Sequence, residues 1–175
     1  AYINDGGAIA PTIGVGGVHL VATNDVVLAR GAKFMVSIDE SGASSWLSVG
    51  GKLSLNSSTL LVAGTGTQKY VAGSRYLVAK ATGGVSGSFG TIDASFLNGS
   101  YFLTPRVSYA TDDVFLTIDR NSHTFASLAA TQNQRHMASS LDATHSGNLI
   151  NALNMLSAVG ARSALKQLDG QVHAS

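Results

Sequence analysis

The chain has 175 residues, of which 45% are hydrophobic and 12% charged, with a formal net charge of +1. The charged fraction is about half of the roughly 25% of an ordinary soluble domain, which argues against a solitary cytosolic enzyme. There is no cysteine, which excludes disulfides, thiolate catalysis and cysteine-bound metals. No basic run indicates nucleic acid as a partner, and no segment has the roughly 18 uninterrupted apolar residues of a transmembrane helix. Residue 1 is alanine and no signal sequence follows, so we expect the true N-terminus to lie upstream.

Residues 1–120 are dominated by short apolar runs separated by Gly, Asn and Ser turns, a pattern typical of β-strands. In the first run, alternation places Val18, Leu20 and Ala22 on one face. The runs in the first half of this region are 17–22, 25–29, 33–38, 46–49, 52–55 and 59–63. No amphipathic helix lies between them, so a βαβ layout is not expected.

The strand region is therefore predicted to form a sandwich, a barrel or a β-solenoid. The solenoid is favoured because leucines recur in strand–turn–strand units without clean hairpin turns, at Leu20, Leu28, Leu47, Leu53 and Leu61. Both ends of the region also lack a polar cap, as expected of coils that stack on neighbours. The units are degenerate and no true repeat is visible, so a Greek-key sandwich stays the alternative.

From Tyr70 onward the sequence pattern changes. Residues 75–92 predict a strand, a Gly-rich turn and a second strand, and residues 100–121 predict a hairpin around Thr111-Asp112-Asp113. Pro105 stands at the start of a strand, where its missing N–H does least harm. The hairpin is the best defined in the chain because two sets of residues alternate, Val107 and Tyr109 in one strand and Val114, Leu116 and Ile118 in the other.

Residues 122–175 have helical periodicity. Ser122 and Ser146 are predicted as N-caps, and a strong amphipathic helix is predicted to stop near Gly160. The apolar stripes consist of Phe125, Leu128 and Ala129; Met137 and Leu141; Leu149, Ile150, Leu153 and Leu156; and Leu165, Leu168 and Val172, the last interrupted by Gly170. Helices with so few charges need a partner surface, which is the β region, another copy through self-association, or a downstream domain.

No constellation for catalysis, cofactor or metal binding is recognised, so we expect none of the three. The five histidines lack the spacing of a zinc helix, and His19 is expected to be solvated. Gly84-Val85-Ser86-Gly87 has the wrong length for a nucleophile elbow and is interpreted as a turn. Asp112-Asp113 is interpreted as a hairpin turn in preference to a calcium site. Two Asn-X-Ser sequences, at Asn56 and Asn98, are interpreted as turns.

Four segments in order resemble the junction between passenger and barrel in bacterial autotransporters (type V secretion): RYLVAKATGGVSGSFG, FLTPRVSYATDDVFLTIDRN, FASLAATQNQRHMASSLD and ALNMLSAVGARSALKQLDGQVHAS. The resemblance implies the end of a right-handed parallel β-helix in residues 1–69. It implies an autochaperone-like β cap with a hairpin in 70–121, and a helical linker in 122–175 leading to an outer-membrane β-barrel beyond Ser175. The chain departs from the family at Gln132, where many relatives have Pro, and at Asp169-Gly170-Gln171.

The resemblance implies a non-catalytic junction that nucleates and caps folding of the secreted passenger and tethers it to the translocator barrel. Its partners would be the upstream coils and the downstream barrel, at the bacterial cell surface on the outer side of the outer membrane. The capping candidates are Tyr76, Phe89, Tyr101, Phe102, Tyr109 and Phe115, and the linker candidates are Leu165, Leu168, Gly170 and Val172. The alternatives are a surface adhesin, or part of a parent protein whose upstream passenger is a protease or esterase.

Overall fold

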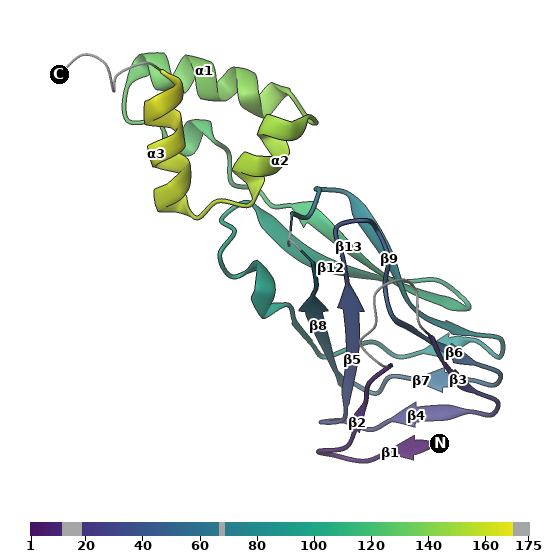
Figure 1. The fold of residues 1–175 in the computed structure, drawn as a ribbon. Helices are drawn as coiled ribbons and strands as arrows, with labels where there is room; N and C mark the ends of the chain where they lie inside the picture. Colours follow the sequence, from purple (N-terminus) through teal and green to yellow (C-terminus); the bar gives the residue numbers. More distant parts are fainter. Residues whose placement is uncertain (12–18, 67–68, 170–175) are drawn as a thin grey trace. The chain divides into compact units, whose positions relative to one another are not determined.

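Short parallel strands visit three sheets in rotation along the first part of the chain (Figure 1). The computed structural model describes residues 1–11, 19–66 and 69–169. It divides the chain into two compact units, each considered by itself. The first contains residues 1–68, 73–96 and 105–118, and the second contains residues 69–72, 97–104 and 119–175.

Each sheet of the first unit takes every third strand. The first sheet contains β1 (Tyr2–Ile3), β4 (Val26–Leu28), β7 (Leu53–Ser54) and β10 (Val85–Ser86). The second contains β2 (Ala8–Ile9), β5 (Lys33–Ile38), β8 (Thr59–Gly64) and β11 (Thr91–Asp93). The third contains β3 (His19–Ala22), β6 (Trp46–Val49), β9 (Ser74–Ala81), β13 (Asp113–Arg120) and β12 (Leu103–Tyr109).

The strand pairing establishes a mainly β chain with parallel sheets, consistent with a β-helix-like fold. A Greek-key sandwich is built from antiparallel strands, and the parallel ladders do not agree with it. Strands 33–38 and 46–49 are confirmed to the residue, and the other strands predicted before Tyr70 agree to within two residues where they are described. Residues 17 and 18 lie outside the described residues.

The register reveals a repeat that the sequence does not display. Lys33 pairs with Thr59, and the other pairs between early turns of the chain have nearly the same separation in sequence. Leu53 then pairs with Val85, which lies distinctly further along the chain. The last turn of chain is longer because its connection from β8 to β9 includes Lys69–Ala72, which belongs to the second unit.

The interior is filled by residues that alternate along the strands, such as Leu28, Phe34, Leu47 and Leu53, which are 0% exposed. Two of the predicted leucines do not belong to it. Leu20 is 43% exposed because β3 is the edge strand of its sheet. Leu61 is half-buried because the inward positions of β8 are Leu60 and Val62.

The second unit contains a short 3-10 helix η2 (Ala126–Leu128) and the helices α1 (Gln132–Ala143), α2 (Asn148–Asn154) and α3 (Ala158–Leu168). A second 3-10 helix, η1 (Ser95–Leu97), ends where the chain enters this unit. No helix among the described residues is long and apolar enough to cross a membrane. One apolar cluster forms the core, made of Phe102, Phe125, Leu128, Ala138, Ile150, Leu153, Ala161 and Leu165.

Several predicted helix boundaries are wrong. Ser122 and Ser146 cap no helix; the caps are Thr131, whose hydroxyl accepts from the Gln134 N–H, and Ser157, whose hydroxyl accepts from the Gly160 N–H. Gly160 lies inside the first turn of α3 and ends no helix. The helical spacing after Phe125 yields only the 3-10 turn η2, because Thr131 starts a new helix three residues later.

Candidate functional site at the hairpin end of the parallel sheets

The hairpin of β12 and β13 continues the third sheet beyond its last parallel strand. β13 pairs antiparallel with β9, from Asp113 opposite Lys80 to Ile118 opposite Ser74. As predicted, Val114, Leu116 and Ile118 alternate, and all three are 0% exposed. Pro105 is the third residue of β12 and lies on an edge strand, where a missing N–H is tolerated.

A register shift in this ladder explains a break in the alternation of β9. Opposite Val114 and Phe115, β9 has Ala79 and Leu77, so Val78 is an extra residue. Both Val78 and Ala79 are consequently buried. A bulge of this kind increases the local twist and redirects the strand. The same strand thus forms a parallel ladder with β6 on one side and an antiparallel ladder with the hairpin on the other.

The hairpin tip supplies acceptors to N–H groups of the last turn of chain. The Val85 N–H donates to the Thr111 carbonyl (2.8 Å) and the Ala81 N–H donates to the Asp112 carbonyl (2.7 Å). The Phe89 N–H donates to the Tyr109 hydroxyl oxygen (2.9 Å). Unpaired N–H groups at a sheet edge invite pairing with further strands. The hairpin tip therefore accepts hydrogen bonds from N–H groups that would otherwise be available to pair with another layer of strands.

Val85 and Ser86 form the strand β10, so the interpretation of residues 84–87 as a simple turn is wrong. Gly84 and Gly87 flank the strand with φ of +94° and +74°, which makes the strand only two residues long. The other predicted turns are confirmed. Asn56 lies in a turn with φ of +39°, Asn98 lies in the turn after η1, and Asp112 lies in the hairpin turn.

An aromatic column joins the interior to the hairpin. Phe34 of β5 stacks on Phe89 with ring centroids 6.2 Å apart, and Phe89 contacts Tyr109 of β12 at 6.4 Å. Phe34 and Phe89 are buried, whereas Tyr109 is 40% exposed. Partial burial raises the pKa of Tyr109, and the hydrogen bond from Phe89 opposes that shift. The column ties three segments that are far apart in the sequence.

Tyr76 is the most deeply buried of the capping candidates in this unit, at 1% exposure. Its hydroxyl donates to the Asp39 carbonyl at 3.0 Å, which ties β9 to the loop after β5. Burial raises the pKa of Tyr76; the hydrogen bond with Ser74 opposes this, and the negative charges of Asp39 and Glu40 add to it.

The loop that accepts from Tyr76 is itself held by the Asp39 carboxylate. Asp39 Oδ1 accepts from the Ser41 hydroxyl (2.6 Å) and from the N–H groups of Ser41 (2.9 Å) and Ala43 (3.0 Å). The hydroxyl of Ser41 is the main cause that lowers the pKa of Asp39. This arrangement is an Asx turn, in which a short carboxylate replaces main-chain acceptors.

Phe115 is half-buried on the outer face of β13. The guanidinium of Arg75 lies over its ring, 3.7 Å from the centroid. Stacking of this kind shields an aromatic ring that the interior does not cover. Sequence reasoning selected the aromatic residues but missed Arg75, Phe34 and Asp39. Of these three residues, only Arg75 could have been found from strand pairing. Arg75 lies directly opposite Thr117, so Phe115, two residues before Thr117, is its diagonal neighbour across the ladder.

The remaining candidates belong to the second unit. Phe102 is part of its apolar core, and Tyr101 packs against that core and stacks on His123 at 4.1 Å. Leu165 is 1% exposed and Leu168 is 44% exposed. Gly170 and Val172 lie outside the described residues. The six capping candidates are therefore divided between two units.

A carboxylate network that sequence reasoning missed holds the second unit. Asp142 Oδ1 accepts from Arg120 Nη2 (2.8 Å) and the Phe125 N–H (2.9 Å), and Oδ2 accepts from the Ala126 N–H (3.0 Å). The guanidinium of Arg120 also lies 4.2 Å from the centroid of the Phe125 ring. The network joins the end of β13, η2 and α1. Asp142 lies in the last turn of α1.

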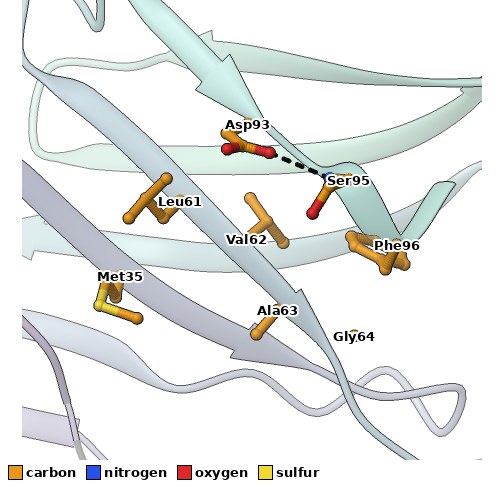
Figure 2. Close-up of a pocket in the computed structure, with 8 residues that line it drawn as sticks. All are labelled: Met35, Leu61, Val62, Ala63, Gly64, Asp93, Ser95 and Phe96. Carbon is orange, nitrogen blue, oxygen red and sulfur yellow. Dashed lines mark hydrogen bonds between the residues drawn. The ribbon is translucent and has the colours of Figure 1, made fainter. Parts of the chain in front are cut away.

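A shallow apolar groove of about 410 Å³ lies on the outer face of the second sheet. Figure 2 shows Met35 of β5 and Leu61 and Ala63 of β8 along it, with Ser95 and Phe96 beyond the end of β11. Asp93 Oδ1 accepts from the Ser95 N–H at 3.1 Å. The groove therefore combines apolar walls with one exposed carboxylate.

Among residues 1–11, 19–66 and 69–169, no group of three His, Asp or Glu side chains could hold a metal ion. His19, predicted to be solvated, is exposed and stacks on Trp46 at 4.6 Å. What the described residues of the hairpin end provide is packing and main-chain pairing.

The sequence matches no model of a known protein family. It is 28% identical over 144 residues to an extracellular serine protease of Serratia marcescens. The matched region covers 78% of the chain and 13% of that protein. The chain therefore corresponds to a small part of this extracellular relative.

Proposed function

We propose that the chain is a non-catalytic segment of a secreted autotransporter, in which the hairpin end nucleates and caps a right-handed parallel β-helix. One observation carries the proposal: the last turn of parallel strands donates to Thr111, Asp112 and Tyr109 of the hairpin. A stack of parallel layers needs an end that stops further pairing. The similarity to an extracellular protein supports a place outside the cell, at the bacterial surface.

The nucleating role follows from the order in which contacts form. The hairpin closes a short loop, from Ala110 to Asp112, whereas each parallel pair joins residues a full turn of chain apart, such as Tyr2 with Val27. Loop-closure entropy makes distant parallel pairing slow, so a preformed hairpin with β9 supplies an edge on which earlier turns stack. Upstream coils of the same polypeptide would stack on β1, β2 and β3, where Tyr2, Leu20 and Val21 are exposed.

Refolding kinetics of a matched pair of leucines test the nucleus. Leu116 in the hairpin and Leu28 in β4 are both 0% exposed, and replacing either with alanine is expected to cost about 2–5 kcal/mol. In Leu116→Ala, most of that free-energy cost should be observed as a lower refolding rate constant. In Leu28→Ala, it should be observed mainly as a higher unfolding rate constant. Stopped-flow kinetics over a range of denaturant concentrations measure both rate constants. The nucleating role would be refuted if the two variants lowered the refolding rate constant equally, or if Leu28→Ala lowered it more.

The second unit is proposed to tether the passenger to a translocator barrel. Its described helices α1, α2 and α3, which follow the strands in the chain and share one small core, support a linker of this kind. The informative experiment appends a barrel and measures surface display. Wild-type linker should display the folded upstream passenger, whereas replacement of residues 122–168 by a flexible Gly/Ser segment should reduce its protease-resistant display. Unchanged display would contradict the tether.

A surface adhesin is the second candidate, and the groove beside Met35 and Leu61 favours it. Binding of the purified chain to cells should then be lost in Ala63→Arg, which fills the groove with a charged side chain. The exposed control Lys52→Arg should retain it. Equal binding by both variants would exclude the groove.

The protease activity in the name of the Serratia protein suggests a parent whose catalytic passenger lies outside this segment. We propose that the 175 residues themselves hydrolyse neither peptides nor esters. Reproducible hydrolysis by the purified chain, abolished by a single Ser→Ala change, would overturn this.

A further inference from the structure

A small cationic cavity in the second unit, distinct from the hairpin end, has no role in the proposed function. It has a volume of about 230 Å³ and is lined by Leu128, Ala130, Gln134, Arg162 and Lys166. The lining includes two cations and no acidic residue. We propose that this cavity binds a phosphate-type oxyanion.

The two cations come from one face of α3. Arg162 and Lys166 are four residues apart, directly after the buried Ala161 and Leu165, so they flank the stripe that packs into the core. Like charges at this spacing repel each other on a helix. Neither side chain has an ion-pair or hydrogen-bond partner among the described residues. A bound anion would remove the repulsion.

Gln134 supplies the neutral donor. The side chain is 3% exposed, and its Oε1 accepts from the Ala130 N–H at 2.9 Å. Because a main-chain N–H can only donate, that contact fixes the carboxamide with its oxygen toward Ala130 and its NH₂ group free. The NH₂ group makes no hydrogen bond to the described part of the chain, although the residue lines the cavity. A carboxamide donor that no protein group accepts is available to an acceptor in the cavity.

The chemistry of the donors selects the ligand. Arginine presents a planar fork that matches phosphate oxygens, and lysine adds a point charge. Together they balance the two negative charges of a phosphate monoester or of hydrogenphosphate. The apolar floor from Leu128 and Ala130 leaves no competing acceptor side chain. The volume suits an oxyanion with at most a small substituent.

Titration of the whole chain with inorganic phosphate, at constant ionic strength set with chloride, tests the site. Saturable binding in calorimetry is expected, with amide shifts in NMR concentrated at the Gln134 side chain, Ala130 and Arg162. The double variant Arg162→Gln/Lys166→Gln should weaken binding by about tenfold or more. The control Arg135→Gln removes an exposed cation on α1 outside the cavity and should leave it unchanged.

Two outcomes overturn the proposal: no saturation by phosphate, or an equal loss in the control and double variants. The shift map of the wild-type chain decides the question even if the double variant folds poorly. Vesicles of phosphatidylcholine with phosphatidic acid distinguish a lipid headgroup from a free phosphate. Sedimentation with these vesicles, reversed by inorganic phosphate, supports the site with a lipid ligand; phosphate binding without sedimentation supports it with a soluble ligand.

Discussion

The parallel-strand unit and the helical unit hold their cores in different ways. In the first, the interior is repeated turn after turn, and each layer contacts the next through main-chain ladders and tight glycine turns. In the second, one cluster of eight buried residues and one carboxylate network hold three helices. A core substitution should therefore destabilise only the neighbouring layers of the parallel-strand unit. In the helical unit, it should destabilise all the helices that share the single small core.

The largest expected effect tests that difference with two phenylalanines that are both 0% exposed. Phe102→Ala removes one of the two phenylalanine rings of the helical core and should cost about 3–5 kcal/mol. Because the helices share this one cluster, we expect loss of most of the helical circular-dichroism signal near room temperature. Urea denaturation followed in the far ultraviolet measures it.

The matched variant is Phe34→Ala in β5. It should lower the denaturation midpoint of the parallel sheets while leaving the helical signal in place. Retention of full helicity in Phe102→Ala, or its loss in Phe34→Ala, would show that the two cores do not differ as described.

The next effect concerns the network at Asp142. Asp142→Asn removes the charge that pairs with Arg120 and offers an NH₂ group where an oxygen accepted. Because hydrogen bonds to charged groups are strong, the expected loss in the free energy of unfolding is about 1.5–3 kcal/mol. Chemical denaturation followed by the helical signal measures it.

Arg135→Gln serves as the control because it also changes one charge on α1 at an exposed position. It should change stability by less than about 0.5 kcal/mol. Similar losses in the two variants would indicate a general charge effect, and the network would then not be the feature that holds the helices.

Close approach of layers in the parallel unit gives the third prediction. A Cβ added at Gly50 would clash with the carbonyl oxygen of Thr23 in the preceding turn of chain. Gly50→Ala should therefore force two layers apart and cost about 1–3 kcal/mol. Thermal denaturation is a sufficient readout.

Gly99 in the second unit is the counterpart, since a Cβ there meets nothing within 4 Å. Gly99→Ala should be neutral within about 0.5 kcal/mol. If both alanines were tolerated equally, the layers would not be limited by main-chain contact at Gly50.

The smallest effect concerns the hairpin of β12 and β13. Tyr109→Phe keeps the ring but leaves the Phe89 N–H without its acceptor, for an expected loss of about 0.5–1.5 kcal/mol. The raised pKa of Tyr109 means that its neutral form is favoured by folding. Its contribution is complete below the ordinary tyrosine pKa of about 10 and is lost as the pH rises through the folded value.

The difference in stability between wild type and Tyr109→Phe should therefore narrow above that pH. Urea midpoints at neutral and alkaline pH measure the change. Tyr2→Phe is the control for the loss of a tyrosine hydroxyl at a surface position, because Tyr2 is 69% exposed. A constant difference across the alkaline range would contradict the rise that burial causes in the pKa of Tyr109.

The sequence by itself determined the strands and the hairpin. Alternation at Val114, Leu116 and Ile118 fixes which face is buried, because a strand exposes successive side chains on opposite sides. It also separated a strand region from a helical one, since the hydrophobic period changes. These are local properties, and runs such as 33–38 were located to the residue.

The tertiary structure decided the layer repeat, the exposure of individual side chains and the hydrogen-bond partners, because these features depend on residues far apart in the chain. The near-constant spacing of the early turns results from main-chain hydrogen bonding between strands. Such pairing is compatible with many different side chains, so the repeat has no fixed sequence motif. Leu20 is apolar yet exposed because its strand is an edge. The partners of Asp142 and Tyr109 are distant in the sequence, at separations that periodicity does not encode. The local sequence therefore determines the elements, whereas long-range pairing determines which side chains contact the hairpin and which fill the helical core.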